Sequence, residues 1–205
     1  MSGAIRGLIQ TKYAGGAVAN RRIVAFGSAD NTAIQATAST NKFLGVSDLP
    51  LGASAATGEP FDVIRCDIAE VDYGGTITRG DRLTADSNGK AVSAEALFGE
   101  KTAVINGGSA GNLTVTGITT SDVLTAVLYY SVSDPLGDAS ITTVTDLTSE
   151  FTITAANTIN NTGGTATTNG RIEVRYRRRV SVIGTAEVSG VSGDVGSVYI
   201  NIQVM

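Results

Sequence analysis

Apolar and polar residues alternate along several short stretches of the chain. The clearest stretch is residues 66–73, in which two sets of side chains alternate: Ala69, Val71 and Tyr73 against Ile68, Glu70 and Asp72. A period of two places successive side chains on opposite faces of a strand, so this stretch predicts a half-buried β-strand. Strands are also predicted at residues 5–10, 21–26 and 61–64.

Turn sequences separate these strands. Residues 86–89, Asp-Ser-Asn-Gly, predict a hairpin with a type I′ turn, because Asn-Gly supplies the positive φ angles that this turn requires. Residues 90–92 are the expected return strand. Two helical segments are also predicted: a single turn at the alanine-rich residues 32–39, and a short helix at residues 93–98 with Ser93 as its cap.

A strand, glycine turn and strand motif occurs twice. The first copy spans residues 43–64 and the second spans residues 182–202. The first copy contains Gly45, Gly52 and Gly58, and the second contains Gly184, Gly190, Gly193 and Gly196. The match needs a one-residue gap before Gly58 and Gly196. This recurrence predicts one β domain whose two related pieces are interrupted by a second module.

The character of the sequence changes near Lys101. Short predicted strands then follow one another as far as Tyr176, separated by turn sequences at residues 134–137, 160–164 and 169–170. Evenly spaced short strands with such turns are typical of a β-sandwich. We therefore expect an all-β protein in which one domain, residues 1–100 and 179–205, is interrupted by an inserted β-sandwich domain, residues 101–178.

Composition agrees with this fold class. The 205 residues include 25 Gly and only 3 Pro, which favours short strands and tight turns. Charged residues make up 17% of the chain, below the usual value of about 25%, which suits a surface that a partner covers, although a plain uncovered surface fits equally well. A net charge of −4 gives no support to nucleic-acid binding, and no basic amphipathic stretch supports membrane binding.

Catalytic chemistry has little support. The chain has no histidine, which is the commonest general base and metal ligand. Its one cysteine, Cys66, is flanked by apolar residues and is expected to be a buried, inert thiol. No glycine-rich nucleotide loop is present, and a structural zinc site lacks ligands. We therefore expect no catalytic, cofactor or metal site, and a protein that is not an enzyme.

Two clusters of charged residues, one acidic and one basic, are candidates for a functional role. Asp67, Glu70 and Asp72 could form a calcium site or an acid pair, but solvated strand charges are the favoured interpretation. A basic cluster follows in the second module: Arg171, Arg175, Arg177, Arg178 and Arg179. All of these except Arg178 would share one strand face. A solvated edge is favoured for this cluster, with an acidic protein partner or nucleic acid as alternatives.

Several segments resemble the capsid cement, or head-decoration, proteins of tailed bacteriophages. The most specific is residues 80–91, Gly-Asp-x-Leu-Thr-Ala-Asp-x-x-Gly-Lys-Ala. The supporting segments are residues 25–30, 43–46, 58–63, 74–79 and 182–186 with the strand that follows. The similarity covers residues 10–98 and 180–205. Residues 112–176 are similar to an accessory module of phage structural proteins.

The resemblance implies a small β-barrel or β-tulip that binds the exterior of an expanded capsid, stabilises the head and contacts the major capsid protein. It implies a structural protein of the virion, made in the bacterial host cytoplasm, that self-associates as a homotrimer or alternatively a dimer. Neither nucleic acid nor a membrane is an implied partner, and the inserted β-sandwich is expected to face outward. The residues expected to face the capsid are Ile5, Leu8, Lys12, Tyr13, Asp30 and Gln35.

Two other functions compete with this one. A carbohydrate-binding or adhesive β-sandwich at residues 101–178 is the first, although only Tyr129, Tyr130 and Tyr176 could supply aromatic contacts there. An esterase or glycosidase with an unrecognised carboxylate site is the weakest, because the chain has no histidine. We see no signal peptide and no run of about 20 apolar residues, so we expect a cytosolic protein or a member of an assembly.

Overall fold

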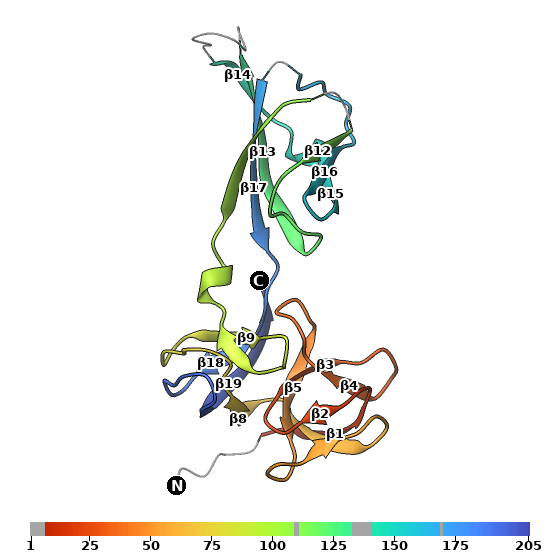
Figure 1. The fold of residues 1–205 in the computed structure, drawn as a ribbon, viewed down its shortest axis with the longest axis vertical. Coiled ribbons are helices and arrows are strands. Elements are labelled where there is room, and N and C mark those ends of the chain that lie inside the picture. Colours follow the sequence, from red (N-terminus) through yellow and green to blue (C-terminus); the bar gives the residue numbers. More distant parts are fainter. Residues whose placement is uncertain (1–6, 109–110, 133–140, 169) are drawn as a thin grey trace. The chain divides into compact units, whose positions relative to one another are not determined.

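The computed structural model describes residues 7–108, 111–132, 141–168 and 170–205. Regular structure in these residues is almost entirely β, so the predicted all-β class is confirmed (Figure 1). The chain divides into two compact units: unit 1 comprises Met1–Leu97 with Val180–Met205, and unit 2 comprises Phe98–Arg179. Within the described ranges, no helix has the length and apolar character needed to cross a membrane.

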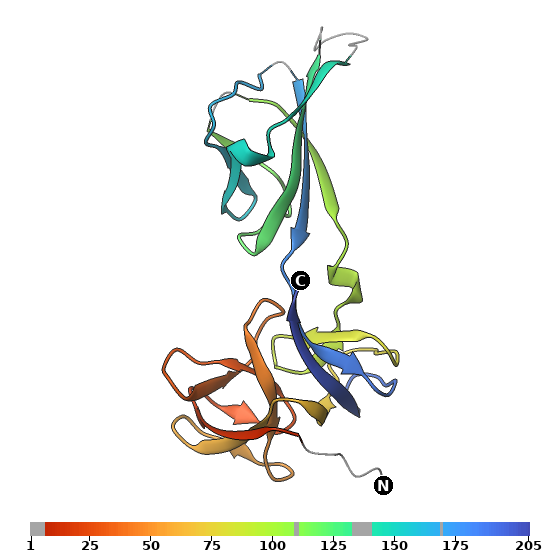
Figure 2. The same cartoon turned by 180° about the vertical axis from the view of Figure 1, so that it is seen from behind.

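The first part of unit 1 is a small closed barrel. Its strands are β1 (Ile9–Ala14), β3 (Ile23–Phe26), β4 (Thr32–Gln35), β5 (Phe43–Asp48) and β7 (Pro60–Ile64), in the order β1-β4-β3-β5-β7. Figure 2 shows this barrel from behind, coloured red to orange. A short sheet of β2 (Val18–Ala19) and β6 (Ser54–Ala55) contributes to the same interior. The buried residues of this interior include Val18, Val24, Ala33, Leu44, Phe61 and Val63.

The second part of unit 1 is a five-stranded antiparallel sheet. Its order is β10 (Ala91–Ser93), β9 (Arg82–Ala85), β18 (Ser181–Ala186), β19 (Val195–Val204) and β8 (Asp67–Asp72). A parallel bridge between Tyr73 and Ala91 joins the two ends of the sheet. The sheet and the outer side of the barrel share one core, which includes Ile23, Phe43, Val46, Val71, Leu83, Ile183 and Val198. Residues from both ends of the chain are therefore buried together.

The predicted helical turn at residues 32–39 is wrong, because residues 32–35 form strand β4. Ala33 is fully buried in the barrel, where a small side chain fits between β1 and β3. Neighbouring strands satisfy the backbone groups of this segment, so tertiary pairing overrides the helical preference of alanine. The helix predicted at residues 93–98 is present as the 3-10 turn η1 (Glu95–Leu97).

Unit 2 consists of two sheets around a separate core. The larger sheet has the order β11 (Lys101–Asn106), β17 (Gly170–Arg178), β13 (Asp122–Val132) and β14 (Ile141–Asp146). The smaller has the order β12 (Asn112–Thr114), β16 (Thr158–Asn161) and β15 (Phe151–Ala155), and the 3-10 turn η2 (Thr148–Glu150) precedes β15. Buried side chains from both sheets include Val127, Phe151, Ile159, Ile172, Val174 and Tyr176. This is the expected sandwich.

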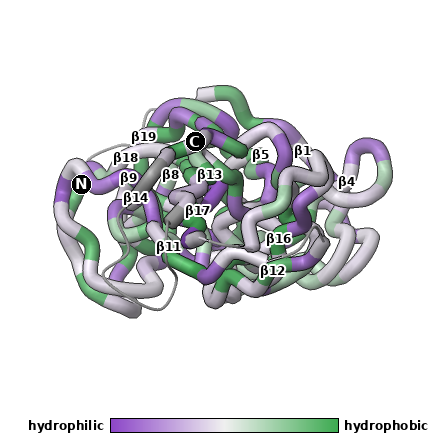
Figure 3. The backbone as a smooth tube through the Cα atoms, turned by 90° about the horizontal axis from the view of Figure 1, so that it is seen from above, coloured by the Kyte–Doolittle hydropathy of each residue, from purple (hydrophilic) through white to green (hydrophobic). Residues whose placement is uncertain are grey.

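Of the turns predicted in unit 2, one starts later than expected and the other two lie wholly or partly outside the described residues. Strand β16 extends to Asn161, so the turn expected at residues 160–164 starts later. The turn expected at residues 134–137 lies outside the described residues, as does position 169 of the turn at residues 169–170. Figure 3 colours the backbone by hydropathy and shows hydrophobic and hydrophilic segments intermixed along the chain.

The repeated motif corresponds to two antiparallel strand pairs, β5–β7 and β18–β19. Its first glycine has the same role in both copies. A Cβ at Gly45 would overlap the carbonyl oxygen of Ile64, and a Cβ at Gly184 would overlap that of Tyr199. The later glycines differ, because Gly58 lies in a turn with a φ of +86° whereas Gly196 lies inside β19. The two copies therefore share the close strand approach at their first glycine, but their later glycines have different roles.

Candidate docking surface

Six residues were expected to face the capsid. Ile5 is outside the described residues, and the other five lie in three places in unit 1. Leu8 is exposed and accepts a backbone hydrogen bond of 2.9 Å from Arg65. Gln35 is half-buried, and its amide oxygen accepts a hydrogen bond of 3.1 Å from the backbone of Ala19. Lys12, Tyr13 and Asp30 lie close together at the loop between β3 and β4.

This loop, residues 27–31, is ordered by its own hydrogen bonds. The hydroxyl of Thr32 donates to the carbonyl of Ala29 at 2.6 Å, and Asn31 has a φ of +59°. Strand β1 is attached to the loop through Asn31: its carbonyl accepts the N–H of Tyr13 at 3.1 Å, and its side chain accepts a hydrogen bond of 3.0 Å from Lys12 Nζ. The loop therefore has a fixed position on the barrel.

Two aromatic side chains accompany the loop. Tyr13 on β1 is 50% exposed and Phe26 at the end of β3 is 53% exposed. Large aromatic side chains contribute strongly to protein interfaces when a partner covers them. We call the group Lys12, Tyr13, Phe26, Asp30 and Asn31 the rim surface; by strand register Phe26 lies on the same face as the buried Ala33, whereas Tyr13 lies on the opposite, outer face of the barrel. Sequence reasoning missed Phe26, because its strand reads as continuously apolar and gives no sign that its last residue is exposed.

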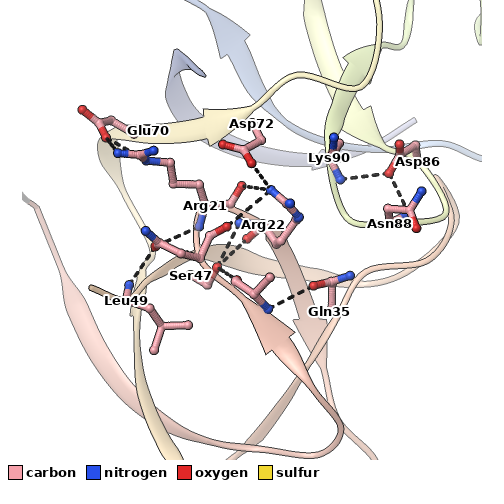
Figure 4. A network of polar contacts seen from close by, with 12 residues as sticks. Arg21, Arg22, Gln35, Ser47, Leu49, Glu70, Asp72, Asp86, Asn88 and Lys90 are labelled. Carbon is pink, nitrogen blue, oxygen red and sulfur yellow. Dashed lines mark hydrogen bonds and ion pairs between the residues drawn. The ribbon is translucent and has the colours of Figure 1, made fainter. Parts of the chain in front are cut away.

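A polar network connects the barrel to the five-stranded sheet (Figure 4). Arg21 contacts Glu70 with 3.0 Å between Nη2 and Oε2, and Arg22 forms an ion pair with Asp72. The backbone N–H of Asp72 also donates to the carbonyl of Arg21 at 3.1 Å. Arg21 adopts a φ of +56° in the tight turn between β2 and β3. This turn and Leu51 border a shallow groove of about 250 Å³.

These ion pairs correct the interpretation of the acidic residues. Glu70 and Asp72 are paired with arginines of the barrel rather than simply solvated, because the sheet folds back against the turn at Arg21. Asp67 has a φ of +64° at the start of β8. In the described part of the chain, no three residues among His, Cys, Asp and Glu are grouped as metal ligands would be.

The specific sequence run at residues 80–91 forms the β9–β10 hairpin. The carboxylate of Asp81 accepts the N–H of Thr78 at 3.0 Å, and that of Asp86 accepts the N–H groups of Asn88 and Lys90 at 2.7 and 2.9 Å. The carbonyl of Gly89 accepts the N–H of Ile23, which attaches the hairpin to the barrel. The polar residues of the run therefore make the turn contacts of the hairpin and hold it against the barrel.

The predicted type I′ turn is wrong, although the hairpin itself is confirmed. Within the Asn88-Gly89 pair only Gly89 has a positive φ, at +69°. The two strands are joined by a longer loop, which is closed by a hydrogen bond of 3.0 Å from the N–H of Asp86 to the carbonyl of Lys90. The side chain of Asp86 supplies the turn contacts that a type I′ backbone would have supplied.

The arginine cluster of unit 2 is partly neutralised. Arg175 contacts Glu173 at 2.6 Å and Arg178 contacts Asp122 at 3.2 Å. The hydroxyl of Tyr130 also donates to Glu173, at 3.0 Å. Arg175 first, and Tyr130 second, hold the pKa of the Glu173 carboxyl below its ordinary value by stabilising its charged form.

Cys66 does not match its expected burial. It is exposed in the bend between β7 and β8, and its Sγ accepts the backbone N–H of Leu8 at 3.1 Å. The apolar residues before it belong to β7, and the chain turns at Cys66 instead of continuing as a buried strand.

No protein-family model matches the chain, and no curated protein matches it. Among solved structures, the chain is similar to one described as the head fiber gp8.5 N base in bacteriophage phi29, with 14% sequence identity and a TM-score of 0.41. That alignment covers 95% of this chain and 93% of the other. A similarity of this size assigns neither a family nor a function to the chain.

Proposed function

We propose that this protein is a structural component of a bacteriophage virion that decorates the exterior of an expanded capsid. In this role it stabilises contacts between major capsid protein subunits. One observation carries the proposal. The two segments that resemble cement proteins, residues 10–98 and 180–205, are far apart in sequence yet build one compact unit with a shared core. The resemblance therefore covers a folding unit rather than scattered turns.

The rim surface is the proposed contact with the capsid. Tyr13 and Phe26 offer two apolar side chains on rigid strands, so a partner that covers them gains buried apolar area with little loss of conformational freedom. Lys12 and Asp30 add charges that can select one orientation of docking. A single contact of this size is weak, but many copies on a symmetric lattice raise the total binding strength.

Stabilisation of the capsid follows from mass action. If the protein binds only the expanded lattice, each bound copy lowers the free energy of that state relative to the unexpanded state. No catalytic step is required. We assign to unit 2 an outward position on the virion surface.

Co-sedimentation with phage heads tests the proposal. Purified protein is mixed with expanded, undecorated heads and, in parallel, with unexpanded proheads. We expect saturable binding to expanded heads only, with a copy number that identifies the occupied lattice sites. Absence of binding to expanded heads, or equal binding to both particles, would rule out the proposed role.

An adhesive role for unit 2 is the second candidate, and one observation favours it. The face of the four-stranded sheet opposite the core carries Tyr130, Arg171, Glu173 and Arg175 beside the exposed Val104 and Val144. An aromatic ring next to charged groups can hold a polar ligand. A glycan array probed with the full chain tests this role, and an array without signal would remove it.

A further inference from the structure

A protein that stabilises contacts between two capsid subunits needs two contact surfaces, one for each subunit. The rim surface includes Phe26, the last residue of β3. The other end of β3 adjoins the groove beside Leu51, which is lined by residues 19–22, residues 51–54 and Asp72. We call this site the Leu51 groove. The rim surface and the Leu51 groove therefore lie at opposite ends of one short barrel strand.

The walls of the Leu51 groove are held in place by hydrogen bonds. The side-chain oxygen of Asn20 accepts the N–H groups of Arg21 and Leu49, both at 2.9 Å. The N–H of Ala53 donates to the carbonyl of Pro50 at 2.9 Å, and the N–H of Asn20 donates to the carbonyl of Ala53 at 3.3 Å. A partner therefore meets a preformed surface and binds with little loss of conformational freedom.

The groove offers hydrogen-bond donors that the described part of the protein does not use. Arg22 is held through Nη1, which pairs with Asp72 (Figure 4), while its Nε and Nη2 have no partner among the described residues. The same is true of Asn20 Nδ2. Thr84 Oγ1 is the only enclosed polar side-chain atom without a hydrogen bond in those residues, so the free N–H groups are reachable from solvent.

The charge of the lining favours an acidic partner. Arg21 and Arg22 stand against one acid, Asp72, and Glu70 pairs with Arg21 from outside the lining. The Nε and Nη2 groups of a guanidinium can bind one carboxylate through two parallel hydrogen bonds. Asn20 adds a neutral donor. A carboxylate-bearing segment therefore complements the groove in both charge and hydrogen bonding.

An apolar side chain stands beside these donors. Leu51 is 83% exposed, more than any other large apolar side chain in the described residues. The groove volume of about 250 Å³ is below the roughly 300–1,000 Å³ of small-molecule sites, which favours a few side chains of a partner protein over a cofactor. A loop that carries an acid next to an apolar residue fits both features.

We propose that the Leu51 groove binds an acidic loop of a major capsid protein subunit adjacent to the subunit that the rim surface contacts. The inference rests on the proposed capsid role. Arg22 and Asn20 donate to the carboxylate of the loop, and Leu51 packs against its apolar neighbour. One copy of the protein then joins two subunits, and the two contacts reinforce each other because the first one holds the second in place.

Asn20→Asp tests the groove. The substitution keeps the oxygen that accepts from Arg21 and Leu49, so the turn should fold, but a negative charge replaces the N–H donors and repels an acidic loop. Co-sedimentation should show an affinity for expanded heads roughly ten-fold or more below that of the wild type. Asn157→Asp in unit 2 is the matched control, because its side-chain oxygen also accepts a backbone N–H, from Gly117 at 2.6 Å. This control should bind like the wild type.

Leu51→Ser tests the apolar contact independently. Its side chain is almost fully exposed, so the substitution should leave the fold intact and still weaken binding to expanded heads. Wild-type affinity in both Leu51→Ser and Asn20→Asp would overturn the inference and leave the proposed capsid role in place. An equal loss in Asn20→Asp and Asn157→Asp would also overturn it, because the effect would then be one of overall charge.

Thermal disruption of decorated heads tests the bridging. At full occupancy, the wild type should raise the temperature at which expanded heads come apart. Asn20→Asp, bound through the rim surface alone, should not, and neither should Tyr13→Ala, because one contact leaves the two subunits unjoined. Equal protection by Asn20→Asp and the wild type would overturn the inference alone. A wild-type protein that does not bind expanded heads would overturn both the inference and the proposed function.

Discussion

The ring of Tyr73 occupies the space that any side chain at position 196 would need. Tyr73 is completely buried, and its hydroxyl donates a hydrogen bond of 2.8 Å to the carbonyl of Val188. A Cβ built on Gly196 would overlap the end of this ring. The burial of Tyr73 raises the pKa of its phenol, because the charged form loses its hydration. Gly196 of β19 therefore leaves the space that the ring of Tyr73, the residue directly after β8, occupies.

Gly196→Ala should destabilise unit 1. The added methyl group must displace the Tyr73 ring, and overpacking of this kind typically costs about 1–3 kcal/mol. Urea unfolding followed by circular dichroism measures the change. Gly16→Ala is the control, because no atom lies within 4 Å of the Cβ position at Gly16 and its φ is not positive. Equal effects of the two substitutions would contradict the packing argument.

Tyr13→Ala and Phe26→Ala should weaken binding to expanded heads without unfolding the protein. Truncation of an aromatic contact at an interface commonly costs about 1–2 kcal/mol, or roughly five- to thirty-fold in affinity. Both side chains are half exposed, so the barrel should keep its stability. Quantitative co-sedimentation checks this prediction. Val104→Ala, at an exposed site in unit 2, should bind like the wild type.

Removal of the Glu173 carboxylate should change how the stability of unit 2 depends on pH. The pKa of Glu173 is lower in the folded state than its ordinary value of 4.5, chiefly because of Arg175. Its charged form therefore stabilises the fold above the unfolded-state pKa, and this contribution disappears as the pH falls through the folded-state pKa.

Thermal unfolding of wild-type protein and Glu173→Gln, followed from neutral pH to well below 4.5, measures this effect. The variant should be less stable near neutral pH, and the gap should close in acid. Tyr130→Phe should produce a smaller change of the same sign, since Tyr130 is the second cause of the shift. A gap that widens in acid would refute the assignment.

Cys66 should react with a thiol reagent in the native protein. The side chain is exposed, so titration without denaturant should detect one thiol per chain. Denaturation should then reveal no additional thiol, and Cys66→Ser should give no signal in either condition. A thiol that reacts only after unfolding would show that the cysteine is buried, as its apolar neighbours had indicated.

The all-β class and most strands of unit 2 follow from local patterns. The alternation at residues 66–73 and the evenly spaced turns after Lys101 reflect strands with one buried face, and such patterns need no knowledge of partners. The same reasoning failed at residues 32–35, where alanine favours a helix in isolation but β1 and β3 supply strand neighbours.

Contacts between individual side chains that are far apart in sequence could not be predicted from local patterns. The pairing of Glu70 with Arg21 and of Asp72 with Arg22 joins elements about 50 residues apart in sequence, and no local pattern indicates it. The exposure of Phe26 depends on where the barrel ends. Lys12, Tyr13 and Asp30 were expected at a docking surface, and the structure brings them together at Asn31, but their role there stays a prediction.

The discontinuous construction of unit 1 has a consequence for synthesis on the ribosome. Strands β18 and β19 occupy the middle of the five-stranded sheet, yet they come from the last segment of the chain, after all of unit 2. Domains tend to fold as units while the chain emerges. Unit 2 can therefore complete its core while β8 and β9 still lack the strands that separate them. During this interval the nascent protein exposes the unpaired edges of β8 and β9, which are the surfaces that chaperones would need to cover.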